Sequence, residues 1–167
     1  RNKALRNARG KYIALQDADD WSDSRRLEMQ LKVAKNSCKR PVIGTNIVIY
    51  DDIRKKTIIR KYPQNDNEIK KVMSRRFMSQ GIFPPSVLML KTHLIEIGSW
   101  RNKFHIACED GDLMDRIYED NDVSFFNVQT VLYNYRLNKG SVTNKLDISI
   151  PYQIFKRACK MKRRNGL

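Results

Sequence analysis

The feature that most constrains the fold is a short apolar run that ends in a cluster of carboxylates. The run spans residues 11–15, and Asp17, Asp19 and Asp20 follow it within five positions. A run of this length beside a glycine indicates a buried strand that delivers its acidic end to a sheet edge. Ligands in open α/β sheets bind outside the carboxyl ends of strands. Because like charges this close repel unless a cation or hydrogen-bond donors compensate them, we predict a ligand site at this turn.

The rest of the chain alternates between apolar runs of strand length and stretches of helical periodicity, which predicts one α/β unit. We expect helices over residues 1–9, 24–36, 66–77, 92–97 and 109–119, and strands over 11–15, 41–50, 53–62, 86–90, 123–126 and 131–135. Gly10 is expected to end the first helix and Ser24 to begin the second. The second helix is expected to turn Leu27, Leu31 and Ala34 toward the core.

The charge balance indicates an anionic partner. The 167 residues include 33 Lys and Arg against 18 Asp and Glu, a formal net charge of +15. Nucleic acid, anionic lipid headgroups and phosphorylated substrates all fit such a charge, which does not choose among them.

The cysteines and the hydropathy pattern bear on the compartment. Cys38, Cys108 and Cys159 are widely spaced and odd in number, which favours reduced thiols in a cytosolic setting over a disulfide framework. No apolar run approaches the roughly 18 residues that a membrane span needs. We therefore expect a cytoplasmic protein. Its basic tail over 146–167 is either a solvated helix face or a helix that holds the protein peripherally at the anionic inner face of a membrane.

A second acidic cluster, residues 109–112, opens a predicted helix. Acids are favoured at helix N-termini, but the number here exceeds what a cap requires. Asp110 lies three, four and seven positions before Leu113, Met114 and Ile117, so we expect its carboxylate along the core-facing side. An inward carboxylate near a ligand site is a candidate general base.

Simpler interpretations exist for both the acidic turn and Arg136. The turn could be solvated, with its aspartates capping the next helix, whereas a calcium loop fails because Trp21 and Ser22 occupy positions that need a ligand and a glycine. A divalent ion held by one or two carboxylates and substrate phosphates fits better. Arg136 could bind phosphate through both guanidinium nitrogens, although a strand and turn explain its segment equally well.

Four segments occur in an order that is typical of one enzyme family. Residues 1–2 and 8–20 read RN and ARGKYIALQDADD, residues 85–90 and 97–100 read PSVLML and IGSW, residues 109–116 read EDGDLMDR, and residues 135–136 and 140–141 read YR and GS. Each segment alone is weak, but the four in this order are fairly specific. Together they resemble the inverting, nucleotide-sugar-dependent glycosyltransferases of family 2, which have the GT-A fold.

The resemblance implies a fold and a domain organisation. It implies a GT-A-like, Rossmann-like mixed sheet flanked by helices. Because the resemblance begins at the ARN element, we expect residues 1–145 to be the C-terminal portion of a catalytic domain whose N-terminal nucleotide-binding half is missing. Residues 146–167 would form a basic C-terminal helix or tail.

The resemblance also implies roles for individual residues. Asp17 and Asp19 would form the DxD pair that binds Mn²⁺ or Mg²⁺ at the donor diphosphate, with Asp17 near the ribose and Asp20 near the donor sugar. Asp110 would deprotonate the acceptor hydroxyl, and Glu109 would bind the acceptor. The remaining substrate-binding residues implied are Arg1, Trp100 and Arg136.

Two positions depart from the family's pattern. Gln16 replaces a usual apolar residue, which we expect to matter little. Asn138 stands where many relatives carry His, so a metal or phosphate role at that position is in doubt.

The leading hypothesis is transfer of a sugar from a nucleotide diphosphate sugar, with a UDP-sugar favoured, to a glycan or lipid-linked acceptor. This would serve polysaccharide or cell-envelope synthesis. The alternatives are a basic nucleic-acid-binding module and an inactive glycosyltransferase fragment. The first is disfavoured because the aromatics lie in apolar runs rather than between basic residues, so we expect no specific nucleic-acid partner.

Overall fold

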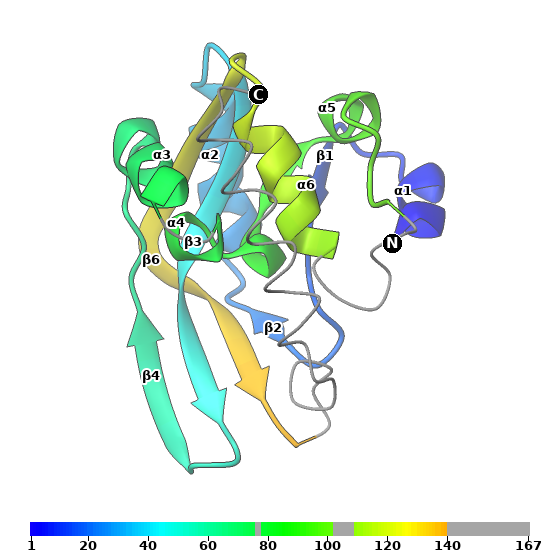
Figure 1. Ribbon diagram of the computed structural model, residues 1–167. Coiled ribbons are helices and arrows are strands. Elements are labelled where there is room, and N and C mark those ends of the chain that lie inside the picture. Colours follow the sequence, from blue (N-terminus) through cyan, green and yellow to red (C-terminus); the bar gives the residue numbers. More distant parts are fainter. Residues whose placement is uncertain (76–77, 102–108, 140–167) are drawn as a thin grey trace.

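The computed structural model describes residues 1–75, 78–101 and 109–139 (Figure 1). The predicted tail over 146–167 and the Gly140-Ser141 element lie outside the described residues. Within these ranges no helix is both long and apolar enough to cross a membrane.

The described elements follow the predicted alternation of helices and strands. The helices are α1 (Asn2–Asn7), α2 (Arg26–Lys35), α3 (Asp66–Arg75), α4 (Met78–Gly81), α5 (Lys91–Glu96) and α6 (Glu109–Tyr118), with a 3₁₀ turn η1 (Pro84–Ser86). The strands are β1 (Tyr12–Ala14), β2 (Trp21–Ser22), β3 (Arg40–Asp51), β4 (Lys56–Arg60), β5 (Leu88–Leu90) and β6 (Val123–Leu137).

The strands form one mixed sheet in the order β1-β5-β3-β6-β2. The long central strands β3 and β6 run parallel, whereas β1, β2, β4 and β5 pair antiparallel to their neighbours. β5 pairs with the first half of β3, and β4 pairs with the second half of β3. The predicted mixed α/β sheet flanked by helices is confirmed.

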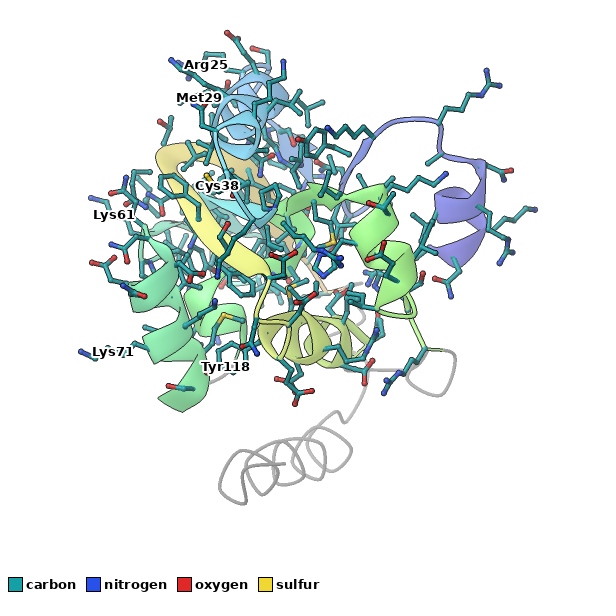
Figure 2. All side chains as sticks on the ribbon, turned by 90° about the horizontal axis from the view of Figure 1, so that it is seen from above. Arg25, Met29, Cys38, Lys61, Lys71 and Tyr118 are labelled. Atoms are coloured by element: carbon teal, nitrogen blue, oxygen red, sulfur yellow. The ribbon has the colours of Figure 1, made fainter. Side chains whose placement is uncertain are left out.

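Helices cover the two faces of the sheet. α2 lies behind the sheet in Figure 1 and α6 in front, and Figure 2 shows them on opposite sides of the strands. The core under α6 joins Leu113, Met114 and Ile117 to Phe125 of β6, and the smaller core under α2 contains Ala34. β1 and α1, which line the cavity described below, lie together with α5 at one side of the sheet (Figure 1).

The face that α2 buries is the predicted one only in part. Ala34 is buried and Leu31 packs against the same core, as predicted. Leu27, however, is 50% exposed, and Arg26 and Gln30 are buried. The prediction was wrong for Leu27 because it counted only apolar side chains. The buried polar residues of α2 satisfy their polar groups by hydrogen bonds to the sheet side of the helix, so they can occupy the inner face.

Two predicted helix caps are also wrong. α1 ends at Asn7, and Ala8 follows in extended backbone while its N–H still bonds to the Ala4 carbonyl, so the helix stops before Gly10. α2 begins at Arg26, because the Arg26 N–H donates to the Asp23 carbonyl at 3.0 Å and the Arg25 N–H donates to Asp23 Oδ1 at 2.9 Å.

The two short strands predicted over 123–126 and 131–135 are one strand, β6, with an irregularity in the middle. The register with β3 shifts on both sides of Asn46. The Asn46 side chain donates to the Gln129 carbonyl at 2.6 Å and accepts from the Tyr62 N–H at 2.8 Å. A polar side chain thus satisfies the backbone where the ladder is interrupted, and the strand continues through the bulge.

Candidate active site

The acidic turn after β1, residues 17–20, is fixed by hydrogen bonds to β6. The Asp17 N–H donates to Tyr133 Oη at 3.1 Å, and Tyr133 Oη donates to Asp20 Oδ2 at 2.6 Å. The Arg136 N–H donates to the other oxygen, Asp20 Oδ1, at 2.8 Å. Both oxygens of Asp20 are therefore engaged, so this carboxylate anchors the turn to β6.

Asp19 points outward from the same turn. Its side chain is exposed, and Asn138 Nδ2 donates to its Oδ2 at 3.1 Å. Asn138, the residue that replaces a histidine of many relatives, thus contacts the acidic turn directly.

Arg1 joins the acidic turn to the start of α6. Its guanidinium lies 3.4 Å from Asp17 Oδ1 and 3.4 Å from Glu109 Oε1, and it contacts Asp110 Oδ1 directly. It also lies 5.7 Å from the centre of the Trp100 ring. The fold therefore gathers five of the eight predicted site residues, which come from three parts of the chain, into one cluster.

Trp100 orients the predicted general base. Its indole Nε1 donates to Asp110 Oδ1 at 3.2 Å, and its backbone is held on both sides by the Asn2 side chain. Asp110 is 28% exposed and faces this cluster.

The carboxylate that points into the core is Asp112 rather than Asp110. Asp112 is buried and accepts two hydrogen bonds from Arg116, at 2.8 and 3.0 Å. Asp110 does not enter the core as expected but lines the cavity, because Arg116, the partner of Asp112, also donates to the carbonyls of Ile97 and Ser99 and holds that face of α6 against the turn after α5.

A cavity of about 330 Å³ lies between α1, β1 and the start of α6. Arg1, Asp17, Trp100 and Asp110 line its polar end. The rest of its wall is mainly apolar, formed by Ala4, Leu5, Ala8, Tyr12, Ile13, Ala14, Leu15 and Pro85, with Gln16 beside them. An apolar cavity with a few convergent polar groups is typical of small-molecule sites.

Of the other predicted site residues, Arg136 is not among those that line this cavity. Its guanidinium lies 5.2 Å from the centre of the Trp21 ring and its Nε is 3.9 Å from Asp52 Oδ2. Its contact with the acidic turn is made by its backbone N–H.

Burial and charge shift the acidity of the turn. Partial burial raises the pKa of Asp17 to about 6, and the neighbouring carboxylates of Asp110, Asp20 and Asp19 add to the rise against the opposing charge of Arg1. Burial also raises the pKa of Asp20, although its two hydrogen bonds oppose the shift. For Arg1, the three nearby carboxylates outweigh burial and raise the pKa of its guanidinium.

The turn fits a divalent metal that substrate phosphates complete. Across the described residues no three His, Cys, Asp or Glu side chains are close enough to hold an ion on their own. Mg²⁺ and Mn²⁺ sites commonly use only one or two carboxylates together with phosphate oxygens. An exposed Asp19 beside a partly buried Asp17 provides this donor set.

Sequence reasoning assigned no site role to three residues that shape the site. Tyr133 bridges Asp17 and Asp20, while Arg26 donates a hydrogen bond to Gln16, the residue just before Asp17. No local pattern marks Tyr133, because its partners are more than 110 residues away. The one available signal was Gln16, a polar residue at a usually apolar position.

The profile of glycosyl transferase family 2 matches residues 1–98, which is more than half of the chain. The chain belongs to this family. It is 29% identical over 137 residues to the uncharacterized glycosyltransferase MJ1057 of Methanocaldococcus jannaschii, covering 82% of this chain and 46% of that protein. It is 28% identical over 167 aligned residues to EpsE of Bacillus subtilis, which is also named as a glycosyltransferase. This alignment covers 93% of this chain and 56% of that protein.

Solved structures of S. aureus TarS share the fold. A structure of TarS residues 1–349 in complex with UDP-GlcNAc superposes with a TM-score of 0.63 at 12% identity, covering 87% of this chain and 40% of that one. A second structure of the same TarS fragment gives a TM-score of 0.60 at 14% identity, covering 81% and 39%. The predicted family and GT-A-like fold are confirmed. The chain spans about half of the length of the curated relatives it matches.

Proposed function

We propose that this chain carries the metal-side and acceptor-side residues of a glycosyltransferase that moves a sugar from a nucleotide diphosphate sugar to an acceptor hydroxyl. The observation that carries the proposal is the cavity where Asp17 from the acidic turn and Asp110 from α6 meet around Arg1 and Trp100. Membership of family 2 supports the same reaction class.

Asp110 is the residue we assign as general base. The acceptor oxygen bonds to the anomeric carbon as the bond from that carbon to the diphosphate oxygen breaks, and the nucleoside diphosphate leaves with the electron pair. The hydroxyl proton passes to Asp110, whose carboxylate Trp100 holds from α5's side of the cavity. Attack from the face opposite the leaving group inverts the anomeric configuration.

The acidic turn is the place we assign to the diphosphate end of the donor. Asp19, with Asp17 beside it, would hold Mn²⁺ or Mg²⁺, while Asp20 fixes the turn. A bound divalent ion would offset the negative charge that grows on the departing diphosphate. Arg1 lies between the two acidic elements, where a guanidinium can bind phosphate oxygens.

A UDP-sugar is the donor we favour, since the TarS structure of the same fold holds UDP-GlcNAc. The acceptor we propose is a glycan or a lipid-linked sugar. The apolar wall of the cavity suits the ring faces and apolar parts of such acceptors.

The test separates chemistry from donor binding. Calorimetric titration with UDP-GlcNAc, with and without Mn²⁺, is combined with a transfer assay. Asp110→Asn should lower transfer by at least about 100-fold while donor affinity stays close to wild type, because the amide cannot accept the proton. Asp19→Ala should abolish the Mn²⁺-dependent part of donor binding.

Glu119→Gln, the same carboxylate-to-amide change at an exposed position just after α6, is the matched control and should change neither quantity. A wild-type protein that neither binds UDP-sugars in Mn²⁺ nor transfers sugar, even when joined to the N-terminal nucleotide-binding half that the family resemblance implies, would contradict the proposed function. Unchanged Mn²⁺ dependence in Asp19→Ala would contradict its assignment as the metal ligand.

A further inference from the structure

Arg26, on the first turn of α2, is a buried guanidinium whose hydrogen-bond partners are all neutral. The residue is 2% exposed. Its donors reach four acceptors: Gln30 Oε1 at 3.1 Å, Gln16 Oε1 at 3.0 Å, Ser22 Oγ at 2.9 Å and the Leu15 carbonyl at 2.8 Å. The ion pairs of the described ranges do not include it, and burial lowers the pKa of Arg26 to about 10. Burying a charge without a counter-charge costs free energy. The presence of Arg26 at this position therefore calls for a role that offsets this cost.

Three of the four acceptors of Arg26 lie at the two ends of the acidic turn. Leu15 and Gln16 precede Asp17, and Ser22 follows Asp20 and Trp21. Ser22 Oγ also donates to Gln16 Oε1 at 2.7 Å, so the two ends are joined directly as well. The side chains of Gln16, Ser22 and Arg26, here called the clasp, therefore close the loop that carries all three aspartates.

The clasp is anchored to the sheet and to Tyr133. Gln30, which accepts from Arg26, donates to the carbonyls of Ile43 and Ser86 at 2.5 and 2.8 Å. The Arg26 guanidinium lies 5.0 Å from the centre of the Tyr133 ring, whose hydroxyl bridges Asp17 and Asp20. The ends of the turn and its middle are thus fixed by one connected set of side chains.

We propose that Arg26 is a positioning residue that, through the clasp, sets the acidic turn in the arrangement that the donor diphosphate and its metal require. The inference rests on the proposed function for its consequence in catalysis. Fixing the loop before the ligand arrives avoids an ordering cost at binding. Lysine could not replace Arg26, because its single ammonium lacks the planar fork that reaches four separated acceptors.

The experiment compares Arg26→Lys and Gln16→Leu with a control on the same helix. Ala34→Gly removes a buried methyl group and lowers the helix propensity of α2 without touching the clasp. Amide hydrogen exchange of the segment 15–23 is measured together with the donor KM, the acceptor KM and kcat. Both clasp variants should raise exchange within 16–22 and raise the donor KM by about tenfold with an unchanged acceptor KM. Ala34→Gly should change neither.

The outcomes separate positioning from ordinary core packing. Faster exchange across β3 and β6 as well as the turn would mark Arg26 as a general core residue and overturn the inference. Faster exchange in the turn with an unchanged donor KM would overturn its link to the donor. If the wild-type protein transfers no sugar, the proposed function fails, and the exchange measurement alone decides whether the clasp holds the turn.

Discussion

The carboxylate of Asp17 is subject to opposing influences that make it sensitive to pH. Burial and three neighbouring carboxylates disfavour its ionised form, and Arg1 favours it, which leaves its pKa at about 6 rather than the usual 3.8. Because the pKa is raised in the folded protein, ionisation of Asp17 costs stability above about pH 6, and this cost is absent below pH 3.8. A metal ion binds the ionised form of Asp17. As the pH rises, metal binding should therefore strengthen while the contribution of Asp17 to folding stability falls.

We therefore predict that Mn²⁺-dependent donor binding weakens about tenfold between pH 7 and pH 5, since protonation of Asp17 removes a negative charge near the metal. Calorimetric titration at pH values across this range measures the change in donor affinity, here called the pH step. Asp17→Asn should lower the donor affinity at pH 7 and abolish the pH step. Its Tm at pH 7.5 should lie no more than roughly 3 °C from wild type, because the side chain is partly exposed.

Asp23→Asn is the matched control for this pH step. Hydrogen bonds from Arg25 lower the pKa of Asp23 to about 2, so its charge does not change between pH 5 and pH 7. Its variant should keep the wild-type pH profile. A step that persists in Asp17→Asn, or one with a midpoint near pH 4, would contradict the assignment of Asp17.

At the scale of elements, Arg116 determines how α6 and the turn after α5 meet. Its guanidinium donates two hydrogen bonds to Oδ2 of the buried Asp112 and also donates to the carbonyls of Ile97 and Ser99. This turn contains Gly98 at φ 84° and Ser99 at φ 51°, both in the left-handed region. The pair thus holds Trp100, one residue further on, against the helix that carries Asp110.

We expect Arg116→Ala to lower the free energy of unfolding by about 3 kcal/mol, because it leaves Asp112 buried without its main partner. Urea denaturation measures the loss. Arg101→Ala removes the weaker, more exposed partner of Asp112, at 3.3 Å, and should cost no more than about 1 kcal/mol. Equal losses in the two variants would show that the buried pair does not hold the turn.

The elements and the site were predictable from the sequence to different extents. Periodicity predicted most helices and strands, and the crowding of Asp17, Asp19 and Asp20 predicted an acidic site, since both patterns are local. The face of α2 was not predictable from hydrophobicity, because Arg26 and Gln30 are buried through hydrogen bonds to distant residues. The rotation of α6 was missed for the same reason, as the partners of Arg116 lie on another segment.

The whole molecule is organised around the parallel pairing of β3 and β6. Their register runs from Arg40 opposite Val123 to Asp51 opposite Leu137, and each strand has a second neighbour on its other side. β6 carries Tyr133, so the acidic turn at one end of the sheet depends on the most extensive pairing in the described structure. β4, in contrast, pairs only with β3, and Ile58 and Ile59 on it are largely exposed.

This arrangement predicts an order of local opening that amide hydrogen exchange can measure. Amides in the first half of β3, including the buried Val42 and Ile43, should exchange only through global unfolding, because strands on both sides and helices on both faces must separate first. Amides of β4 should exchange at least about 100-fold faster, since losing one ladder and little buried surface releases them. The amide of Asp17, held by Tyr133, should follow β6 rather than β4 if the turn is fixed to the central pair. Exchange of β4 as slow as that of β3 would mean that the β3–β4 hairpin opens only with the whole molecule, contrary to the edge position of β4.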